Sequence, residues 1–358
     1  MTTYLQSIQT GVLIFFSVLF VSLIPYMIVQ YRRIGRVSPW LFIVNFSFVL
    51  YLIVAFGMTV FPLPSPQAVA QLTTPTKNLH LFLFVEEFIK YSGFVLTEPN
   101  TWKTALKSPQ FIQPVFNLLL TLPFGFYLRY LFKRKFVFTL IASFLLTLFF
   151  ELTQLSALYG LYPRPYRLFD VDDLLLNTLG ALLGFGLAIW MSKLLPDLSA
   201  VRTEESKVQY GRRMVAFFVD FILATIVELL IPTPVFGIGY ALFFLLIPLI
   251  FKGTLGQKML RIRIEPAYRG RIFLQQVLSI INYLPLIALF IFLNRSGTVP
   301  EEQLGQNYLM ILISLGMNLL PLVDAFIGRL SKTNRLWYER IVKTTMSPAP
   351  KKERKVLK

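Results

Sequence analysis

The most informative polar residues of the chain lie between Phe149 and Gly184. Glu151 and Gln154 are three residues apart, so they share one face if this stretch is a helix. A turn with several carboxylates follows at the head of the next apolar run, where Asp side chains can cap exposed N–H groups. We expect one polar network from six residues: Glu151, Gln154, Arg167, Asp170, Asp173 and Asn177.

Three kinds of chemistry fit this network. It can hold two helices together, with Arg167 on Asp170 or Asp173 and with Glu151 on Gln154 and Asn177. It can form a pocket at the outer leaflet for a lipid head group, a fragment of a cell-wall precursor or a cation. It can also supply general acid–base catalysis, which needs two carboxylates with separated pKa values beside a substrate. No nucleophile, metal triad or phosphate loop accompanies the carboxylates, so we expect no catalytic residue and no cofactor.

The residue types exclude several other sites. The chain has no Cys and a single His, His80. This excludes a disulfide framework, a cysteine nucleophile, thiolate metal ligands and any paired-histidine metal site. We therefore expect no metal centre.

Small residues follow the acidic turn along one helix face. From Asp173, the residues Asn177, Gly180 and Gly184 come at offsets of 4, 7 and 11. The face is therefore polar at the start of the helix and carries small residues further along it. Small residues let a second helix approach closely. We expect the partner to be the apolar run 136–158, which a short loop joins to this helix.

A second set of charged residues lies in the C-terminal half. Arg213, Asp220 and Glu228 fall near one helix face by their spacing. Asp324 comes near the end of the last apolar run, and Glu339 follows in LWYERIVKT. Three alternatives stay open: Arg213 pairs with Asp220 or Asp324 and orients helices, Asp220 and Asp324 form a proton or cation path, or the set binds a membrane partner.

Apolar helices must position these residues, and the sequence contains nine candidates. Hydrophobic residues make up 55% of the 358 residues, and they form runs near the ~20 residues that a spanning helix requires. We expect spans at about 8–30, 40–62, 111–131, 136–158, 174–195, 213–231, 235–251, 273–293 and 308–328. The expected fold class is all-α, a polytopic helical membrane protein with about nine transmembrane helices in two bundles.

The basic residues predict the orientation in the membrane. The net charge of +17 comes from Lys and Arg in the short gaps between apolar runs and in the basic tail 329–358, so they read as topology signals rather than as a nucleic-acid-binding surface. With that tail in the cytoplasm, the basic residues outside are Lys77, Lys90, Lys103, Lys107, Arg164, Arg167 and Arg295. We expect a multi-pass cell-membrane protein with its N-terminus outside, its C-terminus cytoplasmic, a first run that is retained as a span, and membrane lipids as partners.

One apolar segment has charges at its middle. Residues 79–96 include Glu86, Glu87 and Lys90, and counting them as a span would reverse the orientation of the following basic loop. We expect an interfacial or re-entrant helix on the outer face.

The polar stretch 196–213 predicts a domain boundary. We expect a first domain at 1–200 with five spans and the interfacial segment, a second at 201–346 with four spans, and a basic cytoplasmic tail at 347–358.

Residues 1–195 resemble the VanZ-like family of bacterial membrane proteins. The motifs are NLLLTLPFGFYLRYLFKR at 117–134, then ELTQ, then RLFDVDDLLLNTLGALLG from Arg167. The resemblance implies an association with resistance to teicoplanin and related glycopeptides, and it leaves the molecular activity open. Its typical polar positions are those of the six-residue network above.

Residues 205–346 resemble the RDD family of small helical membrane domains. Arg213, Ala216 and Asp220 fit its first motif, and Thr254–Lys258 fits its central loop. Where the family has a late Asp, this chain has Glu339. Together the resemblances imply a non-catalytic membrane protein that contributes to glycopeptide tolerance or to the envelope stress response. The alternatives are a cation- or proton-coupled secondary transporter and a membrane enzyme acting on a lipid-linked substrate.

Overall fold

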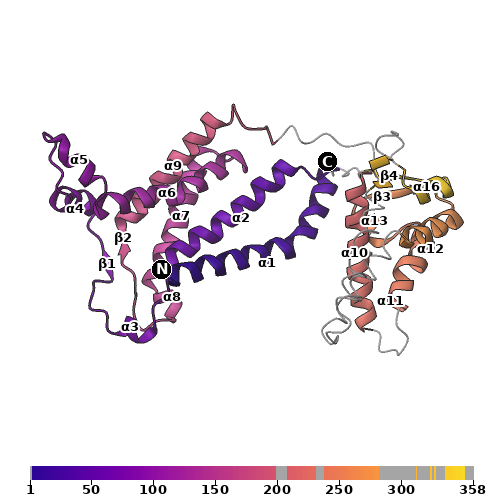
Figure 1. The fold of residues 1–358 in the computed structure, drawn as a ribbon, viewed down its shortest axis with the longest axis horizontal. Helices are drawn as coiled ribbons and strands as arrows, with labels where there is room; N and C mark the ends of the chain where they lie inside the picture. The colour runs from indigo at the N-terminus through magenta and orange to yellow at the C-terminus, as the bar shows by residue number, and fades with distance from the viewer. Residues whose placement is uncertain are drawn as a thin grey trace, which may run out of the picture. The chain divides into compact units, whose positions relative to one another are not determined.

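The computed structural model describes residues 2–198, 208–230, 238–281 and 335–350, and five single positions between them, 312, 323–324 and 326–327. The chain divides into two compact units (Figure 1). The first comprises residues 1–21 and 39–200, and the second comprises residues 22–38 and 201–358.

Five described helices are long and apolar enough to cross a membrane. They are α1 (Thr2–Arg33), α2 (Pro39–Val60), α6 (Pro109–Tyr130), α7 (Phe136–Leu155) and α9 (Val171–Met191). They correspond to the first five expected spans, because the length of an apolar run is a local property that the sequence shows directly. They support a membrane location; the side on which each terminus lies stays a prediction.

The helices α6 and α9 lie against each other along their length (Figure 1). Gly180 faces the backbone of Leu118, and Gly184 faces that of Leu122. A step of four residues toward the C-terminus of α9 thus matches a step of four toward the C-terminus of α6, so the two helices run parallel. A Cβ at Gly180 would lie 2.1 Å from the Leu118 carbonyl oxygen. The small face of α9 therefore packs on α6. The expectation that it packs on the 136–158 run is wrong for these glycines, because proximity in sequence did not decide which helix fills the groove.

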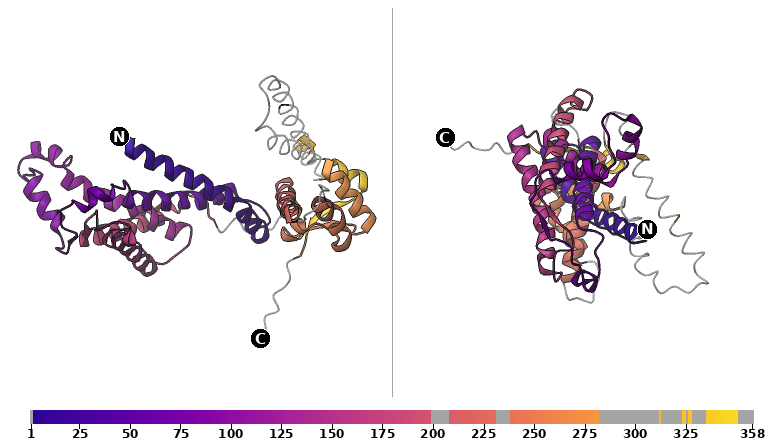
Figure 2. Two further views of the ribbon diagram at one scale, coloured as in Figure 1. Left: turned by 90° about the horizontal axis from the view of Figure 1, so that it is seen from below. Right: turned by 90° about the vertical axis from the view of Figure 1, so that its left-hand side faces the viewer.

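Short elements connect the ends of these helices. They are α3 (Pro66–Ala70), β1 (Lys77–Asn78), α4 (Leu83–Tyr91), α5 (Pro99–Ala105), α8 (Ala157–Gly160) and β2 (Phe169–Asp170). β1 and β2 pair in parallel, with Asn78 opposite Asp170. The purple α4–α5 segment extends from one end of this unit (Figure 2). At nine residues, α4 is about 14 Å long, whereas the hydrocarbon core is ~30 Å thick, so α4 does not span it.

The second unit combines helices with a small antiparallel sheet. Its elements are α10 (Tyr210–Leu230), α11 (Ile238–Ala241), a π-helical turn (Leu242–Leu246), α12 (Ile247–Phe251), α13 (Leu255–Met259), β3 (Ile262–Glu265), a helical stretch at 269–281, α16 (Trp337–Val342) and β4 (Thr345–Pro348). β3 pairs with β4, and alternation along β3 buries Ile262 and Ile264 while Arg263 and Glu265 face out. The two Ile side chains join Tyr31 of α1 in one hydrophobic core.

The expected count of nine spans is not confirmed. Helix α10 has the length of a span, but its charged residues keep it out of the apolar set. The apolar helix Ile238–Phe251 is about 21 Å long, which is short for a span. The runs 273–293 and 308–328 lie largely outside the described residues. The chain is mostly helical, as expected, with two short sheets in addition.

Candidate functional site

Two residues of the predicted network cap the C-terminal end of α2. The Arg167 guanidinium donates to the carbonyl oxygens of Met58 (3.3 Å) and Phe61 (2.5 Å). The Gln154 amide donates to the Thr59 carbonyl at 3.0 Å. The last carbonyls of a helix have no partner within the helix, and a positive charge there also interacts favourably with the helix dipole. Arg167 and Gln154 therefore hold the end of α2 in place, and Arg167 does so without the predicted Asp partner.

Glu151 binds the backbone at the start of α9. Its side chain is 2% exposed, and Oε2 accepts the N–H of Asp170 at 3.0 Å. Asp170 is the N-cap of α9, because its Oδ1 accepts the N–H of Asp172 at 2.9 Å. The same oxygen accepts a hydrogen bond from the Asn78 amide at 3.0 Å. Glu151 and Asp170 together fix where α9 begins.

Asp172 fastens α4 to α9. Its two carboxylate oxygens accept the backbone N–H groups of Phe82 (2.6 Å) and Phe84 (3.1 Å), and its side chain is 3% exposed. These N–H groups lie at the N-terminus of α4, where helix hydrogen bonds are missing. Asp172 was not among the six candidate residues, although three carboxylates in DVDD at a helix start signalled a shared role.

Asp173 and Asn177 face α6. The Asn117 amide donates to the Asp173 carboxylate, and the Thr121 hydroxyl donates to the backbone carbonyl of Asn177. The side-chain oxygen of Asn177 is buried, with no hydrogen-bond partner among the described residues. The six candidates thus lie around the start of α9, but they form separate groups rather than one hydrogen-bonded network.

A cavity of about 230 Å³ lies between α4, α6 and the start of α9. Its polar lining consists of carboxylates and amides, namely Glu87, Gln110, Gln113, Asn117, Asp170, Asp172 and Asp173. Leu83, Phe84, Pro114, Leu168 and Leu176 complete it. Of the predicted network, Asp170 and Asp173 line the cavity. Glu151, Gln154, Arg167 and Asn177 are not among its lining residues.

The remaining polar lining residues were missed from the sequence. Gln110, Gln113 and Asn117 have helix-face spacing, at offsets of three and seven residues, and this amide face was a readable signal. Glu87 comes from the segment expected at the interface. Among the described residues no group of three or more His, Asp or Glu has the arrangement of a metal site.

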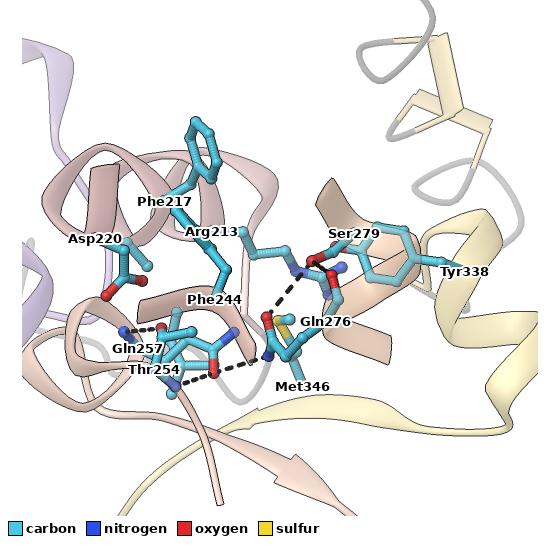
Figure 3. A pocket seen from close by; sticks show the side chains of 12 residues that line it. Arg213, Phe217, Asp220, Phe244, Thr254, Gln257, Gln276, Ser279, Tyr338 and Met346 are labelled. Atoms are coloured by element: carbon cyan, nitrogen blue, oxygen red, sulfur yellow. Dashed lines mark hydrogen bonds between the residues drawn. The ribbon is translucent and has the colours of Figure 1, made fainter. Parts of the chain in front are cut away.

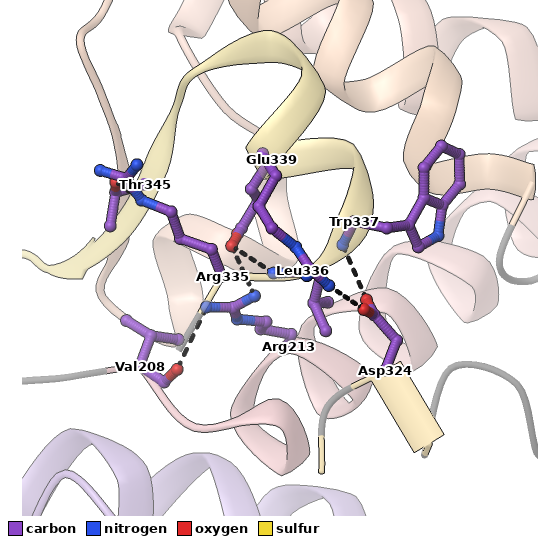
Figure 4. A network of polar contacts seen from close by, with 9 residues as sticks. Val208, Arg213, Asp324, Arg335, Leu336, Trp337, Glu339 and Thr345 are labelled. Carbon is purple, nitrogen blue, oxygen red and sulfur yellow. Dashed lines mark hydrogen bonds and ion pairs between the residues drawn. The ribbon is translucent and has the colours of Figure 1, made fainter. Parts of the chain in front are cut away.

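The charged residues of the second unit form a buried ion pair of different composition from the one expected. Arg213 Nη1 lies 2.9 Å from Glu339 Oε2, and the side chain of Glu339 is fully buried (Figure 4). The same carboxylate oxygen accepts the N–H of Leu336 at 3.0 Å. Burial raises the pKa of the Glu339 carboxyl above its ordinary value, and the nearby Arg213 guanidinium opposes that rise. Glu339 therefore binds the Arg that the sequence paired with Asp220 or Asp324.

The two other carboxylates of this unit hold backbone N–H groups. Asp220 accepts the N–H of Gly256 at 2.7 Å, near the N-terminus of α13, and Asp324 accepts that of Trp337 at 2.7 Å and pairs with Arg340 (Figure 4). A cavity of about 20 Å³ lies beside Asp220, where Figure 3 also shows Arg213, Thr254, Gln257 and Gln276. Its volume suits about one water molecule.

The comparison with known families identifies the region around the larger cavity. Residues 48–192 match the family model VanZ/LLP1. This confirms the VanZ-like part of the predicted resemblance, and the VanZ-like region contains all the lining residues of the larger cavity and all six predicted network residues. The match ends before α10, so the RDD-like character of the second half stays a prediction. No curated protein and no solved structure matches the chain.

Proposed function

We propose that this protein is a non-catalytic membrane protein of a bacterial cell envelope. Its cavity between α4, α6 and α9 binds the head group of a lipid or of a lipid-linked cell-wall precursor. Through that binding it contributes to tolerance of teicoplanin-type glycopeptides or to the envelope stress response. The observation that carries the proposal is the cavity of about 230 Å³, lined by four carboxylates and three amides within the VanZ-like region.

The lining favours a particular ligand chemistry. Carboxylates accept hydrogen bonds, and side-chain amides both donate and accept them. None of the described lining residues is Lys, Arg or His, so a phosphate group would lack a cationic partner there. Hydroxyl, amide and ammonium groups, which occur on sugar and peptide head groups, are better matched. The volume is below the 300–1,000 Å³ typical of sites for drug-sized molecules, so a head group fits better than a large ligand.

The lining also favours binding over catalysis. It contains no Ser, Thr, Tyr or Lys, so carboxylates are the only possible nucleophiles among the described lining residues. Asp170 and Asp172 accept backbone N–H groups that hold α9 and α4 in place. Glu151, a carboxylate of the predicted network, accepts the N–H of Asp170 and does not line the cavity.

The transporter alternative depends on Asp220 and Asp324 as exchangeable carboxylates. Both accept backbone N–H groups, at Gly256 and Trp337, which is the behaviour of helix-capping groups. Because both carboxylates already have this structural role, ion coupling ranks second to binding. The variant Asp220→Asn tests it.

The experiment compares neighbouring carboxylates on α4. Glu87 lines the cavity, whereas the adjacent Glu86 does not, so Glu87→Gln and Glu86→Gln remove the same charge from the same helix. Each variant, together with Asp173→Asn, is expressed in a glycopeptide-susceptible bacterium, and the minimal inhibitory concentration of teicoplanin is measured at matched membrane levels of protein. We expect Glu87→Gln and Asp173→Asn to lose tolerance and Glu86→Gln to keep it.

Two results would contradict the proposal. One is full tolerance in both cavity variants. The other is loss of tolerance only in Asp220→Asn, accompanied by loss of a proton or sodium flux in vesicles, which would favour transport.

A further inference from the structure

The segment 79–106, which lies between two spanning helices, exposes ten large apolar side chains. It contains α4 and α5 and neither element is long enough to cross a membrane. Ile89 is 65% exposed and Leu96 is 74% exposed. The other exposed large apolar residues are Leu79, Leu81, Phe82, Val85, Tyr91, Val95, Trp102 and Leu106.

This segment is folded onto the rest of the first unit. The Asp172 carboxylate holds the N-terminus of α4 through the N–H groups of Phe82 and Phe84. The Phe88 ring packs on Phe111 in the first turn of α6, with ring centroids 6.0 Å apart. The exposed apolar side chains are therefore presented from a fixed position.

The turns after α4 are also held by specific contacts. The Trp102 indole N–H donates to the Val95 carbonyl at 3.2 Å, and its ring lies 6.2 Å from that of Phe94. The Phe94 ring in turn lies 5.4 Å from Phe88. This chain of contacts links α5 to α4.

The apolar side of the segment continues onto α6. Helix α6 begins at Pro109, directly after α5 and a short turn, so the segment must lie at the N-terminal end of a spanning helix. On α6, Ile112, Phe116 and Leu119 are exposed at offsets of four and seven residues, which is one face of the helix. An exposed apolar face on a spanning helix contacts lipid, so the segment borders a lipid-facing surface.

The polar residues of α4 lie on a different face. Phe82, Val85 and Ile89 are exposed on one side, while Glu87, about 165° around the helix from their centre, lines the cavity. A short helix with one apolar and one charged side, accompanied by Trp and Tyr, has the composition of an interfacial helix.

We propose that residues 79–106 lie in the bilayer interface at the N-terminal end of α6, with their exposed apolar side chains inserted among the lipids. The occupant of this surface is the bilayer itself. Helix α4, which contributes Glu87 to the cavity wall, then lies at the depth of the lipid head groups. The cavity therefore opens at the depth where a lipid head group is found. The inference about the surface is independent of which ligand the cavity binds.

The test uses the absence of Cys from the chain, which allows single-Cys labelling without other changes. Ile89→Cys and Leu96→Cys place a nitrobenzoxadiazole fluorophore on the proposed lipid-facing side. Lys90→Cys is the matched control, because Lys90 follows Ile89 and points about 100° around the same helix. The full-length protein is reconstituted into vesicles of phosphatidylethanolamine and phosphatidylglycerol that contain lipids with a nitroxide near the head group or near the end of the acyl chain.

We expect the head-group nitroxide to quench the labels at Ile89 and Leu96 several times more strongly than the label at Lys90. Quenching by the chain-end nitroxide should be weak at all three positions. Equal, weak quenching at all positions would place the segment in water or against another protein and would overturn the proposal. Strong quenching by the chain-end nitroxide would also overturn it, because the segment would then re-enter the hydrocarbon core.

Discussion

Gly184 in α9 gives the most sharply defined test of the packing that positions the site. A Cβ added there would lie 1.8 Å from the backbone carbonyl oxygen of Leu122 in α6. Real Cβ atoms essentially never approach another heavy atom within 3.0 Å, so the helices must separate locally by about 1.2 Å. The obstructing atom belongs to the backbone, so no side-chain rotation can relieve the contact.

The cost of Gly184→Ala follows from this contact. Overpacking of a close-packed interior costs ~1–3 kcal/mol, while Ala gains at most ~1 kcal/mol over Gly from helix propensity. Gly186 lies two residues further along α9 and has no atom within 4 Å of its added Cβ. Gly186→Ala therefore receives the same propensity gain without the clash. We expect Gly184→Ala to be less stable than Gly186→Ala by ~1–3 kcal/mol.

The measurement is denaturation of both purified variants in detergent micelles, followed by circular dichroism. Tryptophan fluorescence, to which Trp190 on the same helix contributes along with the three other Trp residues, provides a second signal. Equal unfolding free energies for the two variants, or a more stable Gly184→Ala, would refute the close contact of α6 and α9. The asymmetry between two glycines of one helix would then have no basis in packing.

Two further predictions concern buried carboxylates. Asp172→Ala removes the acceptor of two N–H groups, so amide hydrogen exchange at Phe82 and Phe84 should accelerate and protease cleavage in segment 79–106 should increase. The control Glu86→Ala should change neither measurement. Unaltered hydrogen-exchange protection in Asp172→Ala would contradict the role of Asp172 in holding α4 to α9. Arg213→Met should lower the unfolding free energy by ~3–5 kcal/mol at neutral pH, and adding Glu339→Leu should restore part of it. Because burial raises the folded-state pKa of Glu339, proton binding by this carboxyl favours the folded protein; this contribution is fully present below the ordinary Glu pKa of about 4.3 and is lost as the pH rises. A protonated Glu339 carries no charge that needs Arg213, so the Arg213→Met penalty should shrink toward pH 4. A penalty independent of pH would contradict the ion pair.

The sequence by itself determined the elements that local chemistry dictates. The five helices that can span follow from the length of their apolar runs, and charges in 79–96 argued correctly against a spanning helix there. Asp170 at the head of α9 does cap that helix, because capping involves groups only two or three residues apart. The amide face of α6 was equally readable, although it was not used.

Only the tertiary structure decided which of these groups meet. Asp173 meets Asn117, 56 residues earlier, because α6 rather than α7 occupies the groove made by the glycines of α9. Glu339 meets Arg213 because the C-terminal segment folds back onto α10 and β3. Spacing along a helix fixes the face on which a side chain lies, but the helix that packs against that face is set by the fit of two surfaces. That fit depends on both partners at once, so no single stretch of sequence contains it.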